Sequence, residues 1–189
     1  MRRRSLLLAT ALITTGRVAQ GDALADRLRQ GGLCLLLRHA RTEPGTGDPP
    51  GFRVDDCATQ RNLDKVGRAQ ARAIGDQLKR MRVPISEVLS SGWCRCRETA
   101  ELIGMGAVVH YPPLDSFFED RSRRDRQRAD ILAFIRGWRS SGNALLVTHQ
   151  VNITAVASVF TGAGEIVVLT PAVELLGRVP PPQPGDLGG

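Results

Sequence analysis

The stretch Gly31-Gly32-Leu33-Cys34-Leu35-Leu36-Leu37-Arg38-His39 decides the fold of this 189-residue chain. Its centre, Leu33 to Leu37, is a continuous apolar run of five residues, with two glycines before it and a polar pair after it. A short unbroken apolar run bounded by turn residues is typical of a strand that is buried on both faces of a parallel sheet. The pattern therefore places Arg38 and His39 at the carboxyl end of a buried strand.

The rest of the chain alternates between helix-like and strand-like segments. The patterns predict helices over residues 64–81, 93–103, 124–139 and 152–160, and strands over residues 87–90, 107–110, 144–148 and 165–169. This alternation predicts an α/β fold of three layers, with a mainly parallel central sheet and helices on both faces. The length suits one domain. The sequence shows no zinc-finger spacing and no aromatic-rich nucleic-acid signature, so we expect no nucleic-acid partner.

Polar residues follow three predicted strands at their carboxyl ends, where ligands bind in parallel sheets. They are Arg38-His39, then Ser90-Ser91 with Arg95 in the first turn of the next helix, then Thr148-His149. Taken singly, they have ordinary interpretations: a surface basic pair, a surface ion pair of Arg95 with Glu98, and a hydrogen-bonded structural histidine. Together they indicate phosphoryl chemistry, because a neutral imidazole can be a nucleophile and a guanidinium binds two phosphoryl oxygens at once.

In this order, the motifs resemble those of the histidine phosphatase superfamily, which has the phosphoglycerate-mutase-like fold. The matching segments are Arg38-His39, Ser90-Ser91, Arg95, Thr99-Ala100, Val147-Thr148-His149 and Gly164-Glu165-Ile166-Val167. The likeness runs from about Leu33 to Leu169, so it implies a phosphoglycerate-mutase-like architecture for nearly all of the predicted domain.

The resemblance implies a role for each matched residue. His39 would attack phosphorus and become phosphohistidine, and water would later release phosphate. The phosphoryl oxygens would be bound by Arg38, Arg95 and His149. No metal and no organic cofactor is implied. The proton donor is open among three candidates, which in order of preference are Asp115, Glu119 and Asp120. The alternative is that no strong acid is used, which would favour substrates with good leaving groups, including phosphohistidine.

Further substrate-binding candidates are Arg41, Thr42, Ser91 and Glu119. The segment from Ala40 to Asn62 is long for a loop in a compact domain, and long loops are often binding loops. Its charged residues either set substrate specificity or are ordinary solvated loop residues; they are Arg41, Glu43, Asp48, Arg53 and Arg61.

The chain departs from the family pattern at Ala40, where Gly is usual, at Gly92, where Pro is common, and at Gln150, where one branch has Asp. The Arg-His-Ala form resembles a subgroup that includes a lipopolysaccharide core heptose phosphatase. We therefore expect a hydrolase of phosphomonoesters that acts on a phosphorylated small molecule or an envelope sugar phosphate. The alternatives are a phosphohistidine phosphatase that acts on proteins and a non-catalytic phosphate-binding protein.

The N-terminus has the three-part order of a bacterial export signal. Three arginines precede an uncharged apolar run from Ser5 to Thr15, and both Ala19-Gln20-Gly21 and Ala23-Leu24-Ala25 are acceptable cleavage sites. We expect a signal peptide over residues 1–25, a phosphatase domain over 26–176, and a disordered Pro- and Gly-rich tail over 177–189. The alternative for the N-terminus is a frayed amphipathic helix.

The predicted mature protein is periplasmic or secreted and has no integral membrane segment. Removing residues 1–25 takes away four arginines and one aspartate, which lowers the formal net charge from +7 to +4. A moderately basic chain fits anionic substrates. Five arginines cluster at and just before the start of the predicted helix over residues 124–139: Arg121, Arg123, Arg124, Arg126 and Arg128. The cluster is either a solvated helix face or a docking patch for an anionic substrate or membrane surface.

The four cysteines suit an exported protein with a disulfide. Cys94 and Cys96 are too close in a helix to bridge each other easily. If a bridge forms, we expect Cys57 to pair with one of those two, which leaves Cys34 free in a buried strand. The alternative is a metal site, although the spacing matches no usual one.

Overall fold

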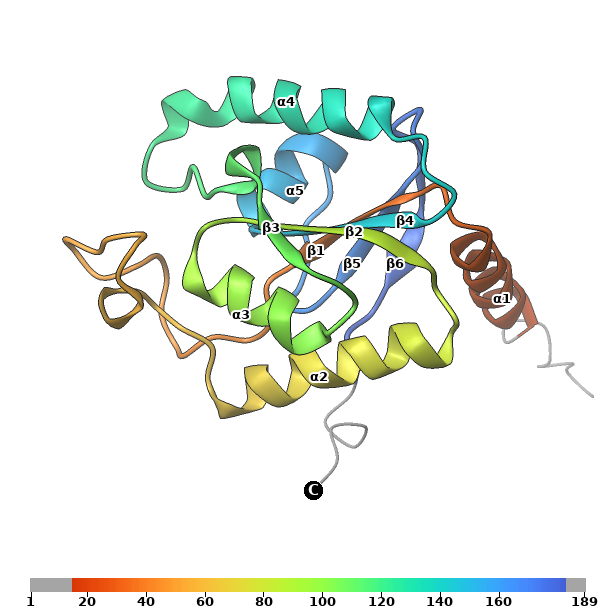
Figure 1. The fold of residues 1–189 in the computed structure, drawn as a ribbon, viewed down its shortest axis with the longest axis horizontal. Helices are drawn as coiled ribbons and strands as arrows, with labels where there is room; N and C mark the ends of the chain where they lie inside the picture. Colours follow the sequence, from red (N-terminus) through yellow and green to blue (C-terminus); the bar gives the residue numbers. More distant parts are fainter. Residues whose placement is uncertain (1–14, 183–189) are drawn as a thin grey trace, which may run out of the picture.

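The computed structural model describes residues 15–182, which form a six-stranded sheet with helices on both faces (Figure 1). The strands are β1 (Cys34–Arg38), β2 (Ile85–Ser90), β3 (Val108–His110), β4 (Asn143–Thr148), β5 (Ile166–Leu169) and β6 (Leu175–Val179). The α-helices are α1 (Thr15–Gln30), α2 (Lys65–Arg80), α3 (Cys94–Ile103), α4 (Arg124–Gly137) and α5 (Gln150–Ala157). Short 3-10 helices lie in the connections at Cys57–Thr59, Pro112–Leu114 and Arg121–Arg123.

The sheet has the order β3-β2-β4-β1-β5-β6. The pairs β3–β2, β2–β4 and β4–β1 are parallel. Strand β5 is antiparallel to both β1 and β6. This confirms the predicted α/β fold with a mainly parallel sheet. It also puts β1 and β4 side by side at the centre, so the Arg-His and Thr-His motifs leave the sheet at adjacent points.

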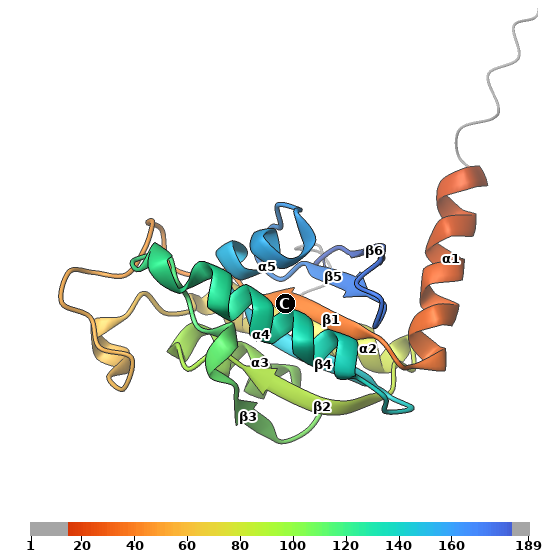
Figure 2. The same ribbon diagram turned by 90° about the horizontal axis from the view of Figure 1, so that it is seen from above.

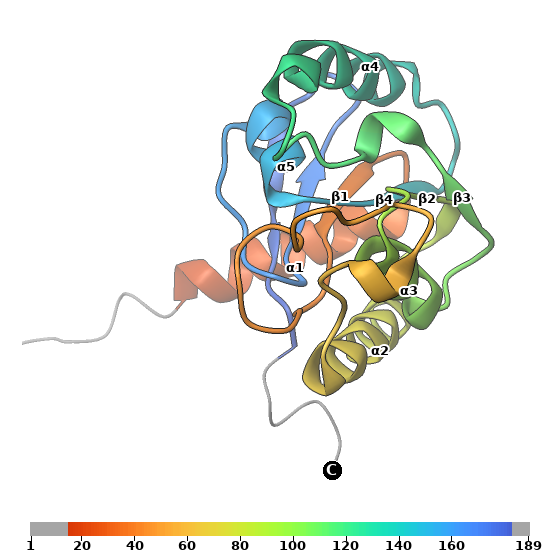
Figure 3. The ribbon, with the colours of Figure 1, turned by 90° about the vertical axis from the view of Figure 1, so that its left-hand side faces the viewer.

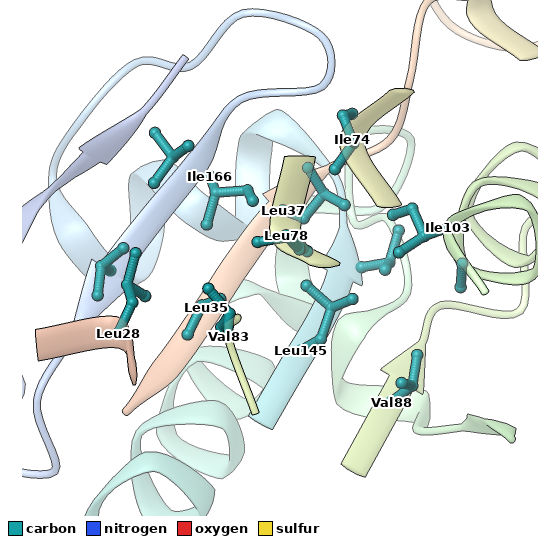
Figure 4. Close-up of a cluster of buried hydrophobic side chains, with 14 of the residues drawn as sticks. Leu28, Leu35, Leu37, Ile74, Leu78, Val83, Val88, Ile103, Leu145 and Ile166 are labelled. Atoms are coloured by element: carbon teal, nitrogen blue, oxygen red, sulfur yellow. The ribbon is translucent and has the colours of Figure 1, made fainter. Parts of the chain in front are cut away.

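Alternate side chains of β1 enter two separate apolar clusters. Leu35 and Leu37 pack with Ile74 of α2 and Ile103 of α3 (Figure 4). Leu36 packs on the opposite face with side chains of α4 and α5, and Figure 1 shows these two helix pairs on either side of the sheet. Because both faces are covered, β1 is apolar throughout rather than alternating. Burying each leucine stabilises the fold by about 1.5–3 kcal/mol.

The long segment between β1 and α2 lies across the end of the sheet, in front of the starts of α3 and α5 (Figure 3). A disulfide between Cys57 and Cys94 joins this segment to the first residue of α3. It agrees with the expected pairing of Cys57, and Cys34 and Cys96 are buried free thiols. A second link is made by the Ala40 N–H, which donates to Oγ1 of Thr99 (3.0 Å).

The domain boundary predicted at residue 177 is wrong. Strand β6 continues to Val179, which pairs with Ile166 of β5, while Arg178 pairs with Val167. Backbone pairing and the burial of Val179 hold this edge strand, and neither is visible in the Gly- and Pro-rich composition that suggested a tail. Residues 183–189 of the predicted tail lie outside the described residues.

Residues 1–14 of the predicted signal peptide also lie outside the described residues, whereas its remainder belongs to α1. Helix α1 lies at the edge of the sheet beside β6 (Figure 2). Leu28 of α1 is fully buried in the apolar cluster that also contains Ile74 and Ile103. Leu24 packs against Gly177 of β6, where an added Cβ would lie 2.8 Å from Cδ2 of Leu24. Among the helices of residues 15–182, none is long and apolar enough to cross a bilayer.

Candidate active site

Three strand ends meet around one cavity at the carboxyl edge of the sheet. The His39 N–H donates to the carbonyl oxygen of Thr148 (3.0 Å), and the Ser91 N–H donates to that of Val147 (3.0 Å). These bonds hold the residues that follow β1 and β2 against β4. The cavity, which we call the catalytic cavity, has a volume of about 270 Å³. The polar and aromatic residues that line it include Arg38, His39, Asp48, Arg61, Trp93, Arg95, Phe118, Glu119, His149 and Phe160.

The ring of His39 is buried and carries its proton on Nδ1. Nδ1 lies 2.9 Å from the carbonyl oxygen of Ala40. Because a carbonyl oxygen can only accept, Nδ1–H is the donor and Nε2 keeps its lone pair. Burial, followed by the nearby charge of Arg95, lowers the pKa of His39 to about 3. The ring is therefore neutral at neutral pH.

The second histidine, His149, lies between the end of β4 and the start of α5 and faces the first. The ring centroids of His39 and His149 are 5.5 Å apart. Oγ of Ser91 lies 2.9 Å from Nε2 of His149 and accepts the Trp93 N–H (3.3 Å). When the Ser91 hydroxyl donates to Nε2, Nδ1 of His149 carries the ring proton. Burial and then the charge of Arg95 lower the pKa of His149 well below its ordinary value.

Three guanidinium groups give the catalytic cavity its positive charge. Arg38 donates from a terminal nitrogen to the carbonyl oxygen of Thr161 (2.7 Å), and Arg61 donates from Nε to that of Gly47 (2.8 Å). The Nε atoms of Arg38 and Arg95 are buried without a hydrogen-bond partner among the described residues. Leaving a buried donor unsatisfied is costly, so both groups are suited to receive an anion.

Asp48 is the internal partner of Arg95. Both side chains are 4% exposed, and the two terminal nitrogens of Arg95 donate to the two carboxylate oxygens at 2.6 and 3.1 Å. The same carboxylate accepts the Arg61 N–H (3.0 Å) and Nε1–H of Trp93 (3.0 Å). Burial alone would raise the pKa of Asp48, but the bonds and charge of Arg95 outweigh it, and the pKa lies below its ordinary value.

The structure does not bring Asp115, the preferred proton donor, to the lining of the catalytic cavity. Its Oδ1 accepts the Gly92 N–H (2.7 Å) and lies 3.1 Å from Nε2 of His110. Asp120 instead caps the 3-10 helix that follows it. Glu119 lines the cavity with an exposed side chain. The order of preference is therefore corrected to Glu119 first, because hydrogen bonding to Gly92 holds the carboxylate of Asp115 elsewhere.

Three other predicted substrate-binding residues, Arg41, Thr42 and Ser91, do not line the catalytic cavity. Arg41 is exposed and pairs with Asp64 (2.7 Å). Thr42 accepts a hydrogen bond from Arg61, and Ser91 bonds His149 as described above. Thr42 and Ser91 thus contact side chains that line the catalytic cavity, without lining it themselves.

The aromatic part of the lining was not predicted from the sequence. Trp93, Phe118 and Phe160 come from three separate connections, and the ring of Phe160 is 74% exposed. Trp93 directly follows the Ser-Ser-Gly segment, so its place next to a recognised motif was the available signal. The two phenylalanines lie in irregular segments, where no periodicity marks a residue as facing a site.

Comparisons with known proteins show which family and which solved structures the chain is similar to. The family model of the histidine phosphatase superfamily (branch 1) matches residues 34–121. Among solved structures, the protein histidine phosphatase SixA complexed with tungstate is similar, with a TM-score of 0.56 and 18% identity, over 82% of this chain and 99% of that one. A phosphoglycerate mutase from Thermus thermophilus has a TM-score of 0.55 and 20% identity, over 78% of this chain and 98% of that one.

A third similar structure is a mycobacterial glucosyl-3-phosphoglycerate phosphatase complexed with VO3, with a TM-score of 0.55 and 16% identity, over 74% of this chain and 93% of that one. A search of curated proteins gave no match. At these identities the solved structures define the class of fold, which is phosphoglycerate-mutase-like. The family model and that fold together show that the chain is similar to the histidine phosphatase superfamily, with the family match limited to residues 34–121.

Proposed function

We propose that this protein is a phosphatase that hydrolyses a phosphomonoester through a phosphohistidine intermediate on Nε2 of His39. The observation that carries the proposal is a buried neutral imidazole with a free Nε2 lone pair, beside a second imidazole and the guanidinium groups of Arg38, Arg61 and Arg95. Positive groups around a positioned nucleophile are what phosphoryl transfer requires of a protein.

In the first step, the Nε2 lone pair forms a bond to phosphorus and the bond to the ester oxygen breaks. The leaving oxygen takes the bond electrons together with a proton from the carboxyl group of Glu119. The phosphoryl oxygens are bound by the guanidinium groups and by Nδ1–H of His149. These donors are held by neighbouring protein groups before substrate arrives, so little reorganisation is needed as charge develops.

In the second step, water attacks phosphorus and gives a proton to the carboxylate of Glu119. The phosphorus–nitrogen bond breaks, its electrons return to Nε2 of His39, and inorganic phosphate leaves. The enzyme is restored in its starting state. We take the substrate to be a phosphorylated small molecule or an envelope sugar phosphate.

A second candidate is the hydrolysis of phosphohistidine on a protein. It is favoured by the placement of Asp115 outside the catalytic cavity, since the carboxylates in the lining are then the ion-paired Asp48 and the exposed Glu119. A phosphohistidine leaving group needs less help from an acid than an alkoxide does. Glu119→Gln separates the two: it should slow hydrolysis of an alkyl phosphate at least tenfold more than that of a phosphohistidine peptide.

We also propose that the protein works outside the cytoplasm. The signal-like N-terminus motivates this, and the disulfide between Cys57 and Cys94 supports it, because such bonds persist mainly in oxidising compartments. N-terminal sequencing of the protein from the periplasm and culture medium tests it. A chain that begins at Met1 and stays in the cytosol would refute export.

A phosphoenzyme trap tests the proposed catalysis. Acid-free quenching after incubation with a radiolabelled aryl phosphate should leave label on wild-type protein. The label should be absent from His39→Ala and present in His110→Ala, the matched change at the chain's remaining histidine outside the catalytic cavity. If wild-type protein binds phosphate but neither turns over nor takes up label between pH 4 and 8, a non-catalytic phosphate-binding protein is the correct description.

A further inference from the structure

A second cavity opens beside the catalytic one, between the start of α4 and the exposed side of α5. We call it the basic cavity. Its volume is about 540 Å³, twice that of the catalytic cavity. The charged, polar and aromatic residues of its lining are Phe117, Arg121, Arg124, Asp125, Gln150, Thr154 and Phe160.

The two cavities are contiguous. Gln150, Val151 and Phe160 line both of them. In addition, the guanidinium carbon of Arg121 lies 5.6 Å above the ring centroid of Phe118, and that ring lines the catalytic cavity. A molecule whose phosphoryl group lies against His39 can therefore extend its other end past Phe160 toward Arg121.

The cationic groups of the basic cavity are not neutralised by the surrounding protein. Arg121 has no carboxylate within ion-pair distance in the described part of the chain, and the adjacent Asp120 accepts hydrogen bonds from Ser122. The carboxylate beside Arg124 is that of Asp125, at 4.0 Å and with both side chains exposed. A contact of that kind contributes little, so both guanidinium groups remain available to a ligand.

The catalytic cavity alone is small for a substrate. Ligand pockets are usually about 300–1,000 Å³, and this cavity must accommodate a phosphoryl group together with the attacking ring. The leaving group of a sugar-sized ester has to extend beyond it, and the basic cavity is the adjoining space. That space presents two guanidinium groups and two phenylalanine rings against one carboxylate, that of Asp125, so its net charge is positive. It therefore favours a leaving group with a negative charge at its far end.

We propose that the basic cavity is the leaving-group site, and that Arg121 and Arg124 bind a second anionic group, a carboxylate or a second phosphate, on the substrate. The inference rests on the proposed function, since that function puts the phosphoryl group against His39. It narrows the substrate class to phosphomonoesters that carry another anion. It also assigns different places to members of the arginine cluster. Arg121 and Arg124 line the basic cavity, whereas Arg126 lines a different cavity with Pro112, Pro113 and Asp130.

Calorimetric binding of uncleavable phosphonates tests this independently of turnover. The probes are three kinds of benzylphosphonate. One has no charged group at the para position, and the other two carry at that position an alkyl chain of one to four carbons that ends in a carboxylate or in an ammonium group. Wild-type protein should bind the best carboxylate probe about tenfold more tightly than the uncharged one, and the ammonium probe more weakly. The double variant Arg121→Gln/Arg124→Gln should lose that preference, and the charge-matched Arg126→Gln should keep it.

A wild-type protein that binds all three probes equally would overturn the proposal. So would a carboxylate preference that survives in the double variant, or one that is lost equally in Arg126→Gln. Both arginines are exposed, and thermal unfolding of each variant checks that the fold is retained. Failure of the phosphatase proposal is seen separately, as absent turnover and absent labelling of His39 in wild-type protein.

Discussion

His39 owes its neutral state to burial, because the protein around it cannot stabilise an imidazolium ion as water does. Arg95 and Arg38 add to the effect by placing positive charge nearby. The Ala40 carbonyl oxygen then selects the tautomer by accepting from Nδ1. Burial and the two arginines thus keep the ring neutral, while the bond to Ala40 opposes them in the pKa but places the proton on Nδ1. A neutral ring with a free Nε2 is what the proposed attack on phosphorus requires.

The same burial makes stability depend on pH. The pKa of His39 is about 3 in the folded protein and 6.5 as the ordinary value, so the unfolded chain takes up a proton first as the pH falls. The contribution of His39 to the free energy of unfolding is fully present above pH 6.5. It is lost as the pH falls from 6.5 to 3, by about 1.4 kcal/mol per pH unit. Urea unfolding between pH 7 and 4.5 should show a shallower pH slope in His39→Asn than in wild type or in His110→Asn. Equal slopes for wild type and His39→Asn would contradict this.

Asp48 acts on the substrate site through Arg95. Asp48→Asn leaves a buried guanidinium without its countercharge, and breaking such a pair typically costs about 3–5 kcal/mol. Because Asn retains one acceptor oxygen, we expect a loss near the lower end. An added anion should replace part of the missing charge, so phosphate or tungstate should raise the melting temperature more in Asp48→Asn than in wild type.

The control for this prediction is Asp55→Asn on the same loop, where the aspartate side chain is 88% exposed. It should change neither the melting temperature nor its response to phosphate. Equal stabilisation of Asp48→Asn and wild type by phosphate would contradict the prediction, because it would mean that the anion does not replace the charge of Asp48 beside Arg95.

At the scale of elements, the first turn of α2 holds the start of the long loop. The Asp64 side chain caps the helix by accepting the Gly67 N–H (2.6 Å). A Cβ on Gly67 would lie 1.8 Å from the carbonyl oxygen of Arg41, two residues after His39. The absence of a side chain at Gly67 therefore lets α2 pack directly on the backbone that leaves the active site.

Gly67→Ala should accordingly destabilise the protein by about 1–3 kcal/mol through overpacking. The matched change Gly137→Ala, at the end of α4, meets no atom within 4 Å and should be neutral or stabilising by up to about 1 kcal/mol. Denaturant unfolding of both variants measures the difference. Equal effects of the two substitutions would mean that the chain relaxes freely at Gly67.

At the scale of the whole molecule, the disulfide joins Cys57 and Cys94, which are 37 positions apart. The closed loop contains the end of the binding loop, α2 and β2. Constraint of the unfolded chain should make this bond worth about 3–4 kcal/mol. Reductant should lower the unfolding free energy of wild-type protein by that amount and leave Cys57→Ser/Cys94→Ser unchanged. A wild-type protein that is indifferent to reductant would contradict this.

Most of the architecture could be predicted because local patterns report burial directly. The apolar run at Leu33 to Leu37 and the helical pattern over residues 64–81 mark faces that must be covered. The short edge strand β6 was missed because Gly177 and the following prolines weaken the strand pattern. In the site, Arg38, His39, Arg95 and His149 each follow or adjoin a predicted strand end. Their gathering into one cavity therefore follows from the parallel order of β1, β2 and β4.

The carboxylates show where sequence reasoning stopped. The order of helices and strands and the position of each polar motif were determined by the chain itself, since hydrophobic periodicity is a local property. Which acidic residue reaches the catalytic cavity was decided only in the tertiary structure: Asp48 and Glu119 line it, whereas Asp115 does not. The reason is that irregular segments have no period, so the direction of a side chain there depends on distant partners such as Arg95 and Gly92.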